Sequence, residues 1–205
     1  MEKDRRIKVD LSKILHHTRA VRFGTFKLTS GRMSPYYIDL RIIPSFPDVF
    51  RQVGELYIEF IKSNVGVDNF ERIAGIPTAG IPFASLSAFH LKKPFLYIRK
   101  TKRLHGRERK IEGLLFPGDR VLLMDDLVTT GLSLVRAASA IRAEGGVVND
   151  AVVMLDREEG GKRRLEKEGI KLHALCKISE VAEELYSIDA ITEDQLMLIK
   201  KQIRA

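Results

Sequence analysis

The stretch VLLMDDLVTTG, Val121 to Gly131, decides the fold prediction for this chain. Its apolar run leads directly into two adjacent carboxylates, Asp125 and Asp126, which are followed closely by two threonines and a glycine. A short apolar run that ends in turn-forming residues predicts a buried strand, here ending at Asp126. Two neighbouring like charges repel each other, so they need hydrogen-bond donors or a cation beside them.

The residues after this predicted strand indicate an anion site. In an open parallel sheet, ligands bind beyond the carboxyl ends of the strands. Backbone N–H groups at the start of the next helix, with the hydroxyls of Thr129, Thr130 and Ser133, can hold a phosphate. The adjoining carboxylates can accept hydrogen bonds from sugar hydroxyls. The stretch therefore predicts a phosphorylated ribose as ligand, and an ordinary helix N-cap role for the aspartates is the alternative.

The composition is that of one globular domain. The chain has 205 residues, of which 44% are hydrophobic and 30% are charged, and a single cysteine, Cys176. A lone cysteine forms no internal disulfide, and the N-terminal sequence MEKDRRIKVD has no apolar signal segment. No apolar run is long enough to cross a bilayer. We therefore expect a cytoplasmic protein that has no membrane partner.

The net charge of +8 is concentrated in one segment. RKTKRLHGRERK, residues 99 to 110, holds seven lysines and arginines and one glutamate, which leaves a net charge of +6. Such a segment indicates a site for a polyanionic small molecule or for a nucleic acid. No aromatic residue interrupts it, which disfavours single-stranded nucleic acid. We therefore expect no nucleic-acid partner.

Apolar periodicity divides the chain into helices and strands. A first helix is predicted from an N-cap at Asp10, residues 24 to 41 predict short strands with a turn, and TKRLHGRERKIEG, residues 101 to 113, predicts a polar loop. After residue 72, strands and helices alternate, which predicts an α/β fold with a mostly parallel sheet and helices on both faces. The predicted strands are RIAGIP, PFLYIRK, RVLLMDD, VVNDAVVMLD and IKLHALCK; the predicted helices are PDVFRQVGELYIEFIK, GIPFASLSAFHL, TGLSLVRAASAIRAEGG, KRRLEKEG, SEVAEELYSI and TEDQLMLIKKQIRA, the last with a Thr192–Gln195 capping box.

Five segments of the chain resemble one enzyme family. VLLMDDLVTTG resembles the phosphoribosyl pyrophosphate (PRPP) motif of type I phosphoribosyltransferases. FGTFKLTSGRMSPYYIDLR, IAGIPTAGIP, RKTKRLHGRERKIEG and MLDREEGG resemble the hood, the pyrophosphate loop, the mobile basic loop and the orotate-binding strand end of orotate phosphoribosyltransferases. These matches run from about residue 20 to 160, in the family's order.

The resemblance implies a type I phosphoribosyltransferase fold in a single domain spanning residues 1–205. The hood would comprise about residues 20–45 with C-terminal contributions, and the core about residues 46–178. The implied reaction joins orotate to PRPP and gives orotidine 5′-monophosphate and pyrophosphate, a step of pyrimidine (UMP) synthesis. Mg²⁺ is the implied cofactor, carried by PRPP without a direct protein ligand. A homodimer is implied, with the basic loop completing the partner's site.

The resemblance also assigns site residues. Arg157 can bind the carboxylate of orotate in bidentate fashion, although a surface ion pair with Glu158 or Glu159 is the alternative. Orotate contacts are implied for Tyr37, Ile38, Thr129 and Arg157. Catalytic roles are implied for Arg99, Lys100, Arg103, His105, Asp125 and Asp126. The same six residues would bind PRPP, together with Thr78, Ala79, Leu127, Val128, Thr129, Thr130, Gly131, Leu132 and Ser133.

Two positions depart from the family's pattern. Thr29 stands where bacterial members often carry a lysine, and Arg103 where the basic loop usually has one. Arginine keeps the charge but donates a proton poorly, so a proton donor would have to be Lys102 or His105. Two rivals remain: a purine phosphoribosyltransferase, which the hood and Arg157 disfavour, and a regulator that senses PRPP. The 20 or so residues before the hood leave too little room for a DNA-reading helix-turn-helix.

Overall fold

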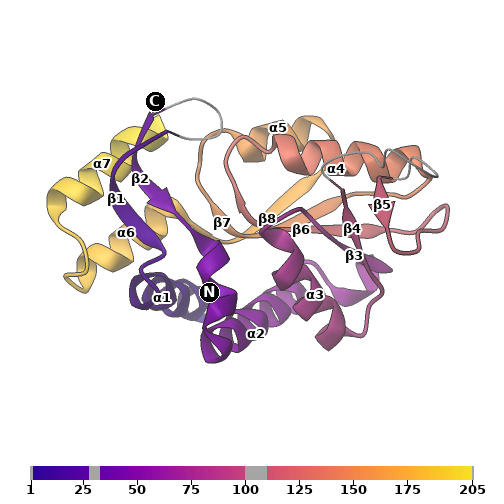
Figure 1. The fold of residues 1–205 in the computed structure, drawn as a ribbon, viewed down its shortest axis with the longest axis horizontal. Coiled ribbons are helices and arrows are strands. Elements are labelled where there is room, and N and C mark those ends of the chain that lie inside the picture. The colour runs from indigo at the N-terminus through magenta and orange to yellow at the C-terminus, as the bar shows by residue number, and fades with distance from the viewer. Residues whose placement is uncertain (1, 28–32, 100–109, 205) are drawn as a thin grey trace.

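The computed structural model describes residues 2–27, 33–99 and 110–204. Its centre is a six-stranded sheet in the order β5-β4-β3-β6-β7-β8 (Figure 1). All neighbouring strands pair in parallel except β5, which pairs antiparallel to β4. The strands are β3 (Arg72–Gly75), β4 (Phe95–Ile98), β5 (Ile111–Glu112), β6 (Val121–Val128), β7 (Asp150–Asp156) and β8 (Lys171–Lys177).

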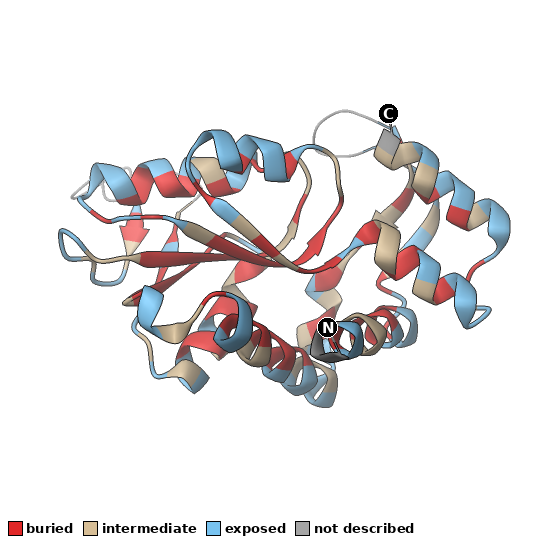
Figure 2. Ribbon diagram, turned by 180° about the vertical axis from the view of Figure 1, so that it is seen from behind, coloured by how far each residue is buried: buried red, intermediate tan, exposed pale blue. Residues whose placement is uncertain are grey.

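Helices cover both faces of this sheet, as predicted. Figure 1 shows α4 and α5 on one side of the sheet and α1, α2 and α3 on the other. Buried apolar residues line the strands and the inner sides of these helices (Figure 2). Because side chains alternate along a strand, Leu122 and Met124 join one core and Val121 and Leu123 the other. The helices are α1 (Glu2–His17), α2 (Pro47–Asn64), α3 (Gly80–Leu91), α4 (Leu132–Ala143) and α5 (Gly161–Lys167).

A second, smaller sheet stands beside the core. Strands β1 (Val21–Lys27) and β2 (Met33–Ile38) pair antiparallel, with Val21 opposite Ile38. Helix α7 (Glu193–Arg204) packs on β2, and α6 (Ile178–Ser187) packs on α1 and α7. The two C-terminal helices therefore lie at the end of the molecule that holds the small sheet (Figure 1). Short 3₁₀ helices, η1 (Leu40–Ser45) and η2 (Val67–Asn69), flank α2.

Several predicted boundaries are confirmed by hydrogen bonds. Helix α3 spans the predicted residues, and the capping box at α7 is present. There the Thr192 N–H donates to Gln195 Oε1 at 3.0 Å, and the Gln195 N–H donates to Thr192 Oγ1 at 3.3 Å. No helix in the described ranges is both long and apolar enough to span a bilayer.

Three predicted boundaries are wrong. Helix α1 starts at Glu2, so Asp10 lies inside it; buried Ile7 extends the apolar stripe of Leu11 and Leu15 backwards. The end of the expected polar loop is a strand, because Glu112 pairs with Tyr97 of β4. Strand β6 continues past the aspartates to Val128, because it pairs with β7.

Candidate active site

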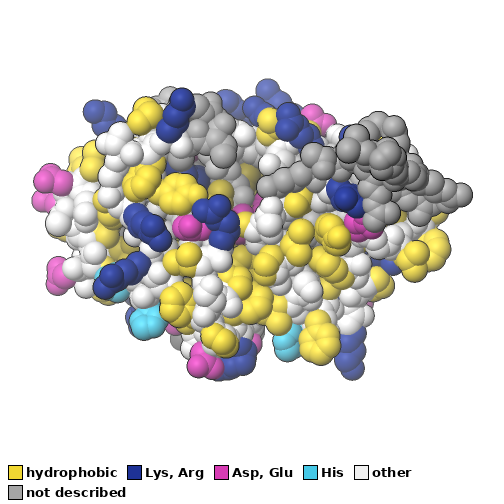
Figure 3. Space-filling view, in the orientation of Figure 1, with side chains coloured by type: hydrophobic (Ala, Val, Ile, Leu, Met, Phe, Trp, Pro, Cys, Tyr) yellow, Lys and Arg dark blue, Asp and Glu magenta, His cyan; other side chains and the backbone are white. Residues whose placement is uncertain are grey.

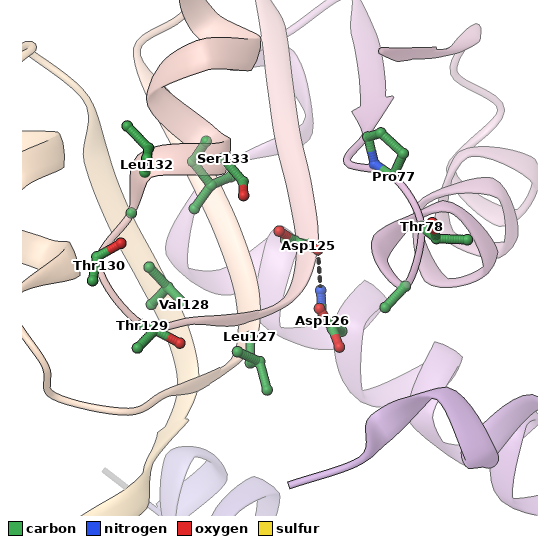
Figure 4. A pocket seen from close by; sticks show the side chains of 13 residues that line it. Pro77, Thr78, Asp125, Asp126, Leu127, Val128, Thr129, Thr130, Leu132 and Ser133 are labelled. Carbon is green, nitrogen blue, oxygen red and sulfur yellow. Dashed lines mark hydrogen bonds between the residues drawn. The ribbon is translucent and has the colours of Figure 1, made fainter. Parts of the chain in front are cut away.

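A cavity of about 310 Å³ opens at the carboxyl end of the sheet. It lies between the loop that joins β3 to α3 and the loop that joins β6 to α4 (Figure 4). The structure thus brings together two predicted segments that are 45 residues or more apart in the sequence. The lining residues are Pro77, Thr78, Ala79, Asp125, Asp126, Leu127, Val128, Thr129, Thr130, Gly131, Leu132, Ser133 and Leu134.

The two aspartates occupy successive positions of β6, and both line the cavity (Figure 4). Asp125 Oδ1 accepts a hydrogen bond from the Asp126 N–H at 2.9 Å, and the Tyr57 hydroxyl donates to the Asp125 carbonyl at 3.0 Å. Burial raises the pKa of Asp126 above its ordinary value, and the interaction of its side chain with that of Asp125 opposes this effect. The pair therefore places two neighbouring carboxyl groups at the cavity.

The loop after β6 presents the start of α4 to the cavity. Gly131 precedes the helix with φ of 76°, a left-handed conformation that suits glycine. A Cβ on Gly131 would lie 3.0 Å from the Gly161 carbonyl oxygen, so α5 also leaves no room for a side chain. No side chain caps the first turn of α4 in the described part of the chain. Its N–H groups and the flanking hydroxyls therefore remain available to an anion.

The loop before α3 is held against the aspartates by its backbone. The Ile76 N–H donates to the Met124 carbonyl at 3.0 Å, and the Gly80 N–H donates to the Ile76 carbonyl at 3.0 Å. The peptide bond between Pro77 and Thr78 is cis. A Cβ on Gly80 would lie 2.7 Å from Asp125 Cα, so only glycine permits this approach.

The predicted basic residues fall mostly outside the described ranges. Lys100, Arg103 and His105 lie there, as do Thr29 and Lys102, so their predicted roles stay predictions. Arg99 is described: it forms an ion pair with Glu112 and does not line the 310 Å³ cavity. It lines a neighbouring cavity of about 860 Å³ instead. Pro77 and Ser133 line both cavities, which places Arg99 near the predicted anion site.

The residues predicted to hold orotate do not line the 310 Å³ cavity, apart from Thr129. Ile38 is only 4% exposed and belongs to the hydrophobic core. Tyr37 is half-buried, with its ring 5.5 Å from that of Phe26. Arg157 follows β7, and its backbone N–H donates to the Val128 carbonyl at 3.0 Å. Arg157 therefore lies at the same edge of the sheet as the loop that joins β6 to α4.

Arg157 already has a carboxylate partner, and the pair is buried. Its Nε donates to Glu159 Oε1 at 2.9 Å, and the two side chains are 4% and 3% exposed. The alternative interpretation of Arg157, an ion pair with Glu158 or Glu159, is therefore present as a pair with Glu159, although this pair is buried and does not lie at the surface. The guanidinium also lies over the ring of Tyr36, with Cζ 4.8 Å from the ring centre. Burial raises the pKa of Tyr36.

Neither Tyr36 nor Arg41 was predicted as a site residue. Tyr36 shares a strand face with Ile38, and its ring lies against the guanidinium of Arg157. Arg41 donates through Nη2 to the Tyr37 hydroxyl at 2.9 Å and through Nε to Asp39 at 2.7 Å. Its charge also lowers the pKa of Asp126, which links the hood to the acidic pair. The feature of the sequence that could have indicated Arg41 is IDLR, residues 38 to 41, in which two opposite charges, Asp39 and Arg41, follow the end of a strand.

The described residues contain no group of three or more His, Cys, Asp or Glu that could hold a metal ion. Asp125 and Asp126 line the cavity as a pair of neighbouring carboxyl groups. Mg²⁺ demands near-octahedral oxygen geometry and often binds one or two carboxylates plus substrate phosphates. The site therefore suits an ion that arrives with a phosphorylated substrate better than a resident one.

The phosphoribosyl transferase domain family matches residues 45–187. The orotate phosphoribosyltransferase of Cenarchaeum symbiosum is 43% identical over 193 residues, which cover 94% of this chain and 96% of that protein. This chain belongs to the orotate phosphoribosyltransferase family. The family's enzyme from Aeropyrum pernix has a similar structure, with a TM-score of 0.78 and 32% identity over 86% of this chain and 98% of that one. The structure of Leishmania donovani UMP synthase is also similar, with a TM-score of 0.85 and 35% identity over 95% of this chain and 42% of that longer chain.

Proposed function

We propose that the protein transfers the 5-phosphoribosyl group from PRPP to orotate, which gives orotidine 5′-monophosphate and pyrophosphate for pyrimidine synthesis. The observation that carries this proposal is the placement of Asp125 and Asp126 beside an uncapped helix start, in a chain 43% identical to an orotate phosphoribosyltransferase. The cavity has acceptors for a ribose diol at one side and donors for a phosphate at the other. A phosphorylated ribose fits this distribution of charge.

Each part of PRPP would be bound by a different group of residues. The start of α4, with Thr129, Thr130 and Ser133, holds the 5-phosphate, and the acidic pair holds the ribose hydroxyls. Charge builds on the leaving diphosphate as the anomeric bond breaks, so fixed positive charge lowers the barrier. Arg99 is near enough to supply part of it, with Lys100, Arg103 and His105 supplying the rest. Thr78 and Ala79 lie at the edge of the cavity, where the diphosphate would pass.

Mg²⁺ carried by PRPP would supply positive charge that offsets the charge of the diphosphate. The protein's part is to hold the sugar and its phosphates in place, because the described residues contain no group of three or more His, Cys, Asp or Glu that could hold a metal ion. A cytoplasmic location, which the sequence analysis expected, stays a prediction.

A homodimer is also part of the proposal. Apolar side chains gather on the face of the molecule around α3 (Figure 3). Phe89 at the end of that helix is 78% exposed, and contiguous exposed apolar patches mark interaction surfaces. Burial of this surface against a second copy would bring two chains together. The basic segment of one chain, residues 99 to 110, would then act in the partner's site.

The test of the proposed function is a base panel. The purified protein, PRPP and Mg²⁺ are incubated separately with orotate, uracil, adenine, guanine and xanthine, and pyrophosphate release is measured. Pyrophosphate release is expected with orotate and with none of the other four bases. Turnover with a purine base, and none with orotate, would assign the chain to another reaction.

Arg157→Ala tests the base-binding side. Because the arginine is the candidate partner of the substrate carboxylate, its loss should raise the KM for orotate roughly tenfold to a hundredfold while PRPP affinity stays the same. Unchanged orotate kinetics would remove Arg157 from the site.

A further inference from the structure

The buried partner of Arg157 is built into the chain by an unusual backbone turn. Glu158, between Arg157 and Glu159, has φ of 58°, a left-handed conformation that is rare for glutamate. Its N–H donates to Asp156 Oδ1 at 2.8 Å, and its own carboxylate accepts from the Ser179 N–H at 3.0 Å. The backbone bond to Asp156 holds the turn in place, and the turn brings Glu159 back onto Arg157.

The contact with Glu159 uses only one edge of the guanidinium. Glu159 Oε1 lies 2.9 Å from Nε and 2.9 Å from Nη2, which is the side edge of the fork. Nη2 is also 3.4 Å from Ser34 Oγ, at the long limit of a hydrogen bond. The hydrogen bonds of this side chain within the described ranges come from Nε and Nη2. An arginine has five N–H donors, so the terminal edge can still receive a second carboxylate.

The plane of the guanidinium is fixed as well. It lies over the Tyr36 ring, whose buried hydroxyl makes no hydrogen bond of ordinary geometry with described residues. Ser34 Oγ donates to the Tyr36 carbonyl at 2.7 Å, which ties this part of β2 together. A side chain held at one edge and against one face has a single orientation left. Preorganisation of this kind reduces the entropy lost when a ligand binds.

We propose that Glu159 is a positioning residue: it holds the side edge of Arg157 so that the terminal Nη1–Nη2 edge faces the carboxylate of orotate. This inference rests on the proposed function. Glu159 itself touches no substrate. It keeps the buried guanidinium neutralised and aligned while the base site is empty, since a buried charge without a partner is costly.

The experiment compares Glu159→Ala with Glu159→Gln. The alanine variant removes both the charge and the acceptor, so the KM for orotate should rise about tenfold to a hundredfold, the equivalent of one charge-assisted hydrogen bond of about 1.5–3 kcal/mol. The glutamine variant keeps an acceptor oxygen and should recover most of that loss. PRPP affinity by calorimetry, and inhibition by uracil, which lacks the carboxylate, should stay within about twofold of wild type in both.

Glu158→Ala is the matched control. It removes the same charge one residue away, and with it the bond to Ser179, without touching Arg157. It should lower the melting temperature and leave the orotate KM within about twofold of wild type.

Three results would overturn the inference. An unchanged orotate KM in Glu159→Ala shows that Arg157 needs no positioning, and a lower KM shows that Glu159 competes with orotate. Equal losses for orotate, uracil and PRPP show a structural role alone. Orotate turnover by the wild-type protein separates these outcomes from failure of the proposed function: without it both proposals fall, and with it only the role of Glu159 does.

Discussion

Gly80→Ala tests how tightly the start of α3 is packed against the acidic strand. The new Cβ would lie 2.7 Å from Asp125 Cα and 2.7 Å from the Met124 carbonyl oxygen. Ordinary van der Waals contact begins near 3.4 Å, so the two backbones must separate by roughly 0.7 Å. Strand β6 cannot yield freely, because Met124 is paired with Gly75 of β3 on one side and Val152 of β7 on the other.

The magnitude follows from this overlap. Overpacking of this kind costs about 1–3 kcal/mol, and the better helix propensity of alanine offsets up to about 1 kcal/mol of it. For a chain of this length, each kcal/mol lowers the melting temperature by about 2–4 °C. Displacement of Asp125 should also weaken PRPP binding by about tenfold or more, the equivalent of one charge-assisted hydrogen bond. Thermal unfolding and titration calorimetry with PRPP measure the two effects.

Gly169→Ala provides the control. Gly169 has φ of 68°, and a Cβ there meets nothing within 4 Å, so its cost is backbone strain of about 1–2 kcal/mol. It should lose stability comparably and keep its affinity for PRPP. The reasoning is refuted if Gly80→Ala binds PRPP as the wild type does, or if the two variants lose affinity equally.

Four further predictions concern the acidic pair and the basic loop. Asp126→Asn should weaken PRPP binding about tenfold or more by calorimetry; equal affinity would contradict a role in holding the ribose. Burial raises the pKa of Asp126, and PRPP binding needs the ionised carboxylate, so the affinity of the wild-type protein for PRPP should fall as the pH drops through that pKa. The folded protein holds this proton more tightly than the unfolded chain does, so the stability of the fold should decline as the pH rises through the same window. Arg41 lowers that pKa, so Arg41→Ala should move the acid limb of the binding profile to higher pH; an unmoved limb would separate Arg41 from the pair. Mixing Arg103→Ala with Asp126→Asn subunits should restore some activity if the loop acts across a dimer, and no recovery after confirmed subunit exchange would count against it.

Local signals explain what the sequence predicted correctly. Helix α3 matches its expected residues because an apolar stripe and small residues at its start are visible within a dozen positions. The strand–turn–helix at residues 121 to 133 was recognisable for the same reason. Repeated alternation of such units predicts a parallel sheet, because each crossover helix must return the chain to the same edge. Thus the α/β architecture and most of the turn between β6 and α4 follow from the sequence alone.

Other features depend on partners that are distant in the chain. Strand β6 runs past the aspartates because Leu127 pairs with Leu155 of β7, so both aspartates belong to the strand and not to the turn after it. Strand β5 exists because β4 lies beside it.

The sequence by itself determined the fold class, the strand, turn and helix that carry the predicted anion site, and the family, since periodicity, turn residues and motif spacing act over short stretches of chain. Only the tertiary structure decided that Arg157 is buried, lies on Tyr36 and is already paired with Glu159. Tyr36 and Arg157 are 121 positions apart, and no local pattern records which residue a distant strand will bring into contact. Burial and pairing are properties of the packed chain, and they set the geometry with which these side chains can meet a substrate.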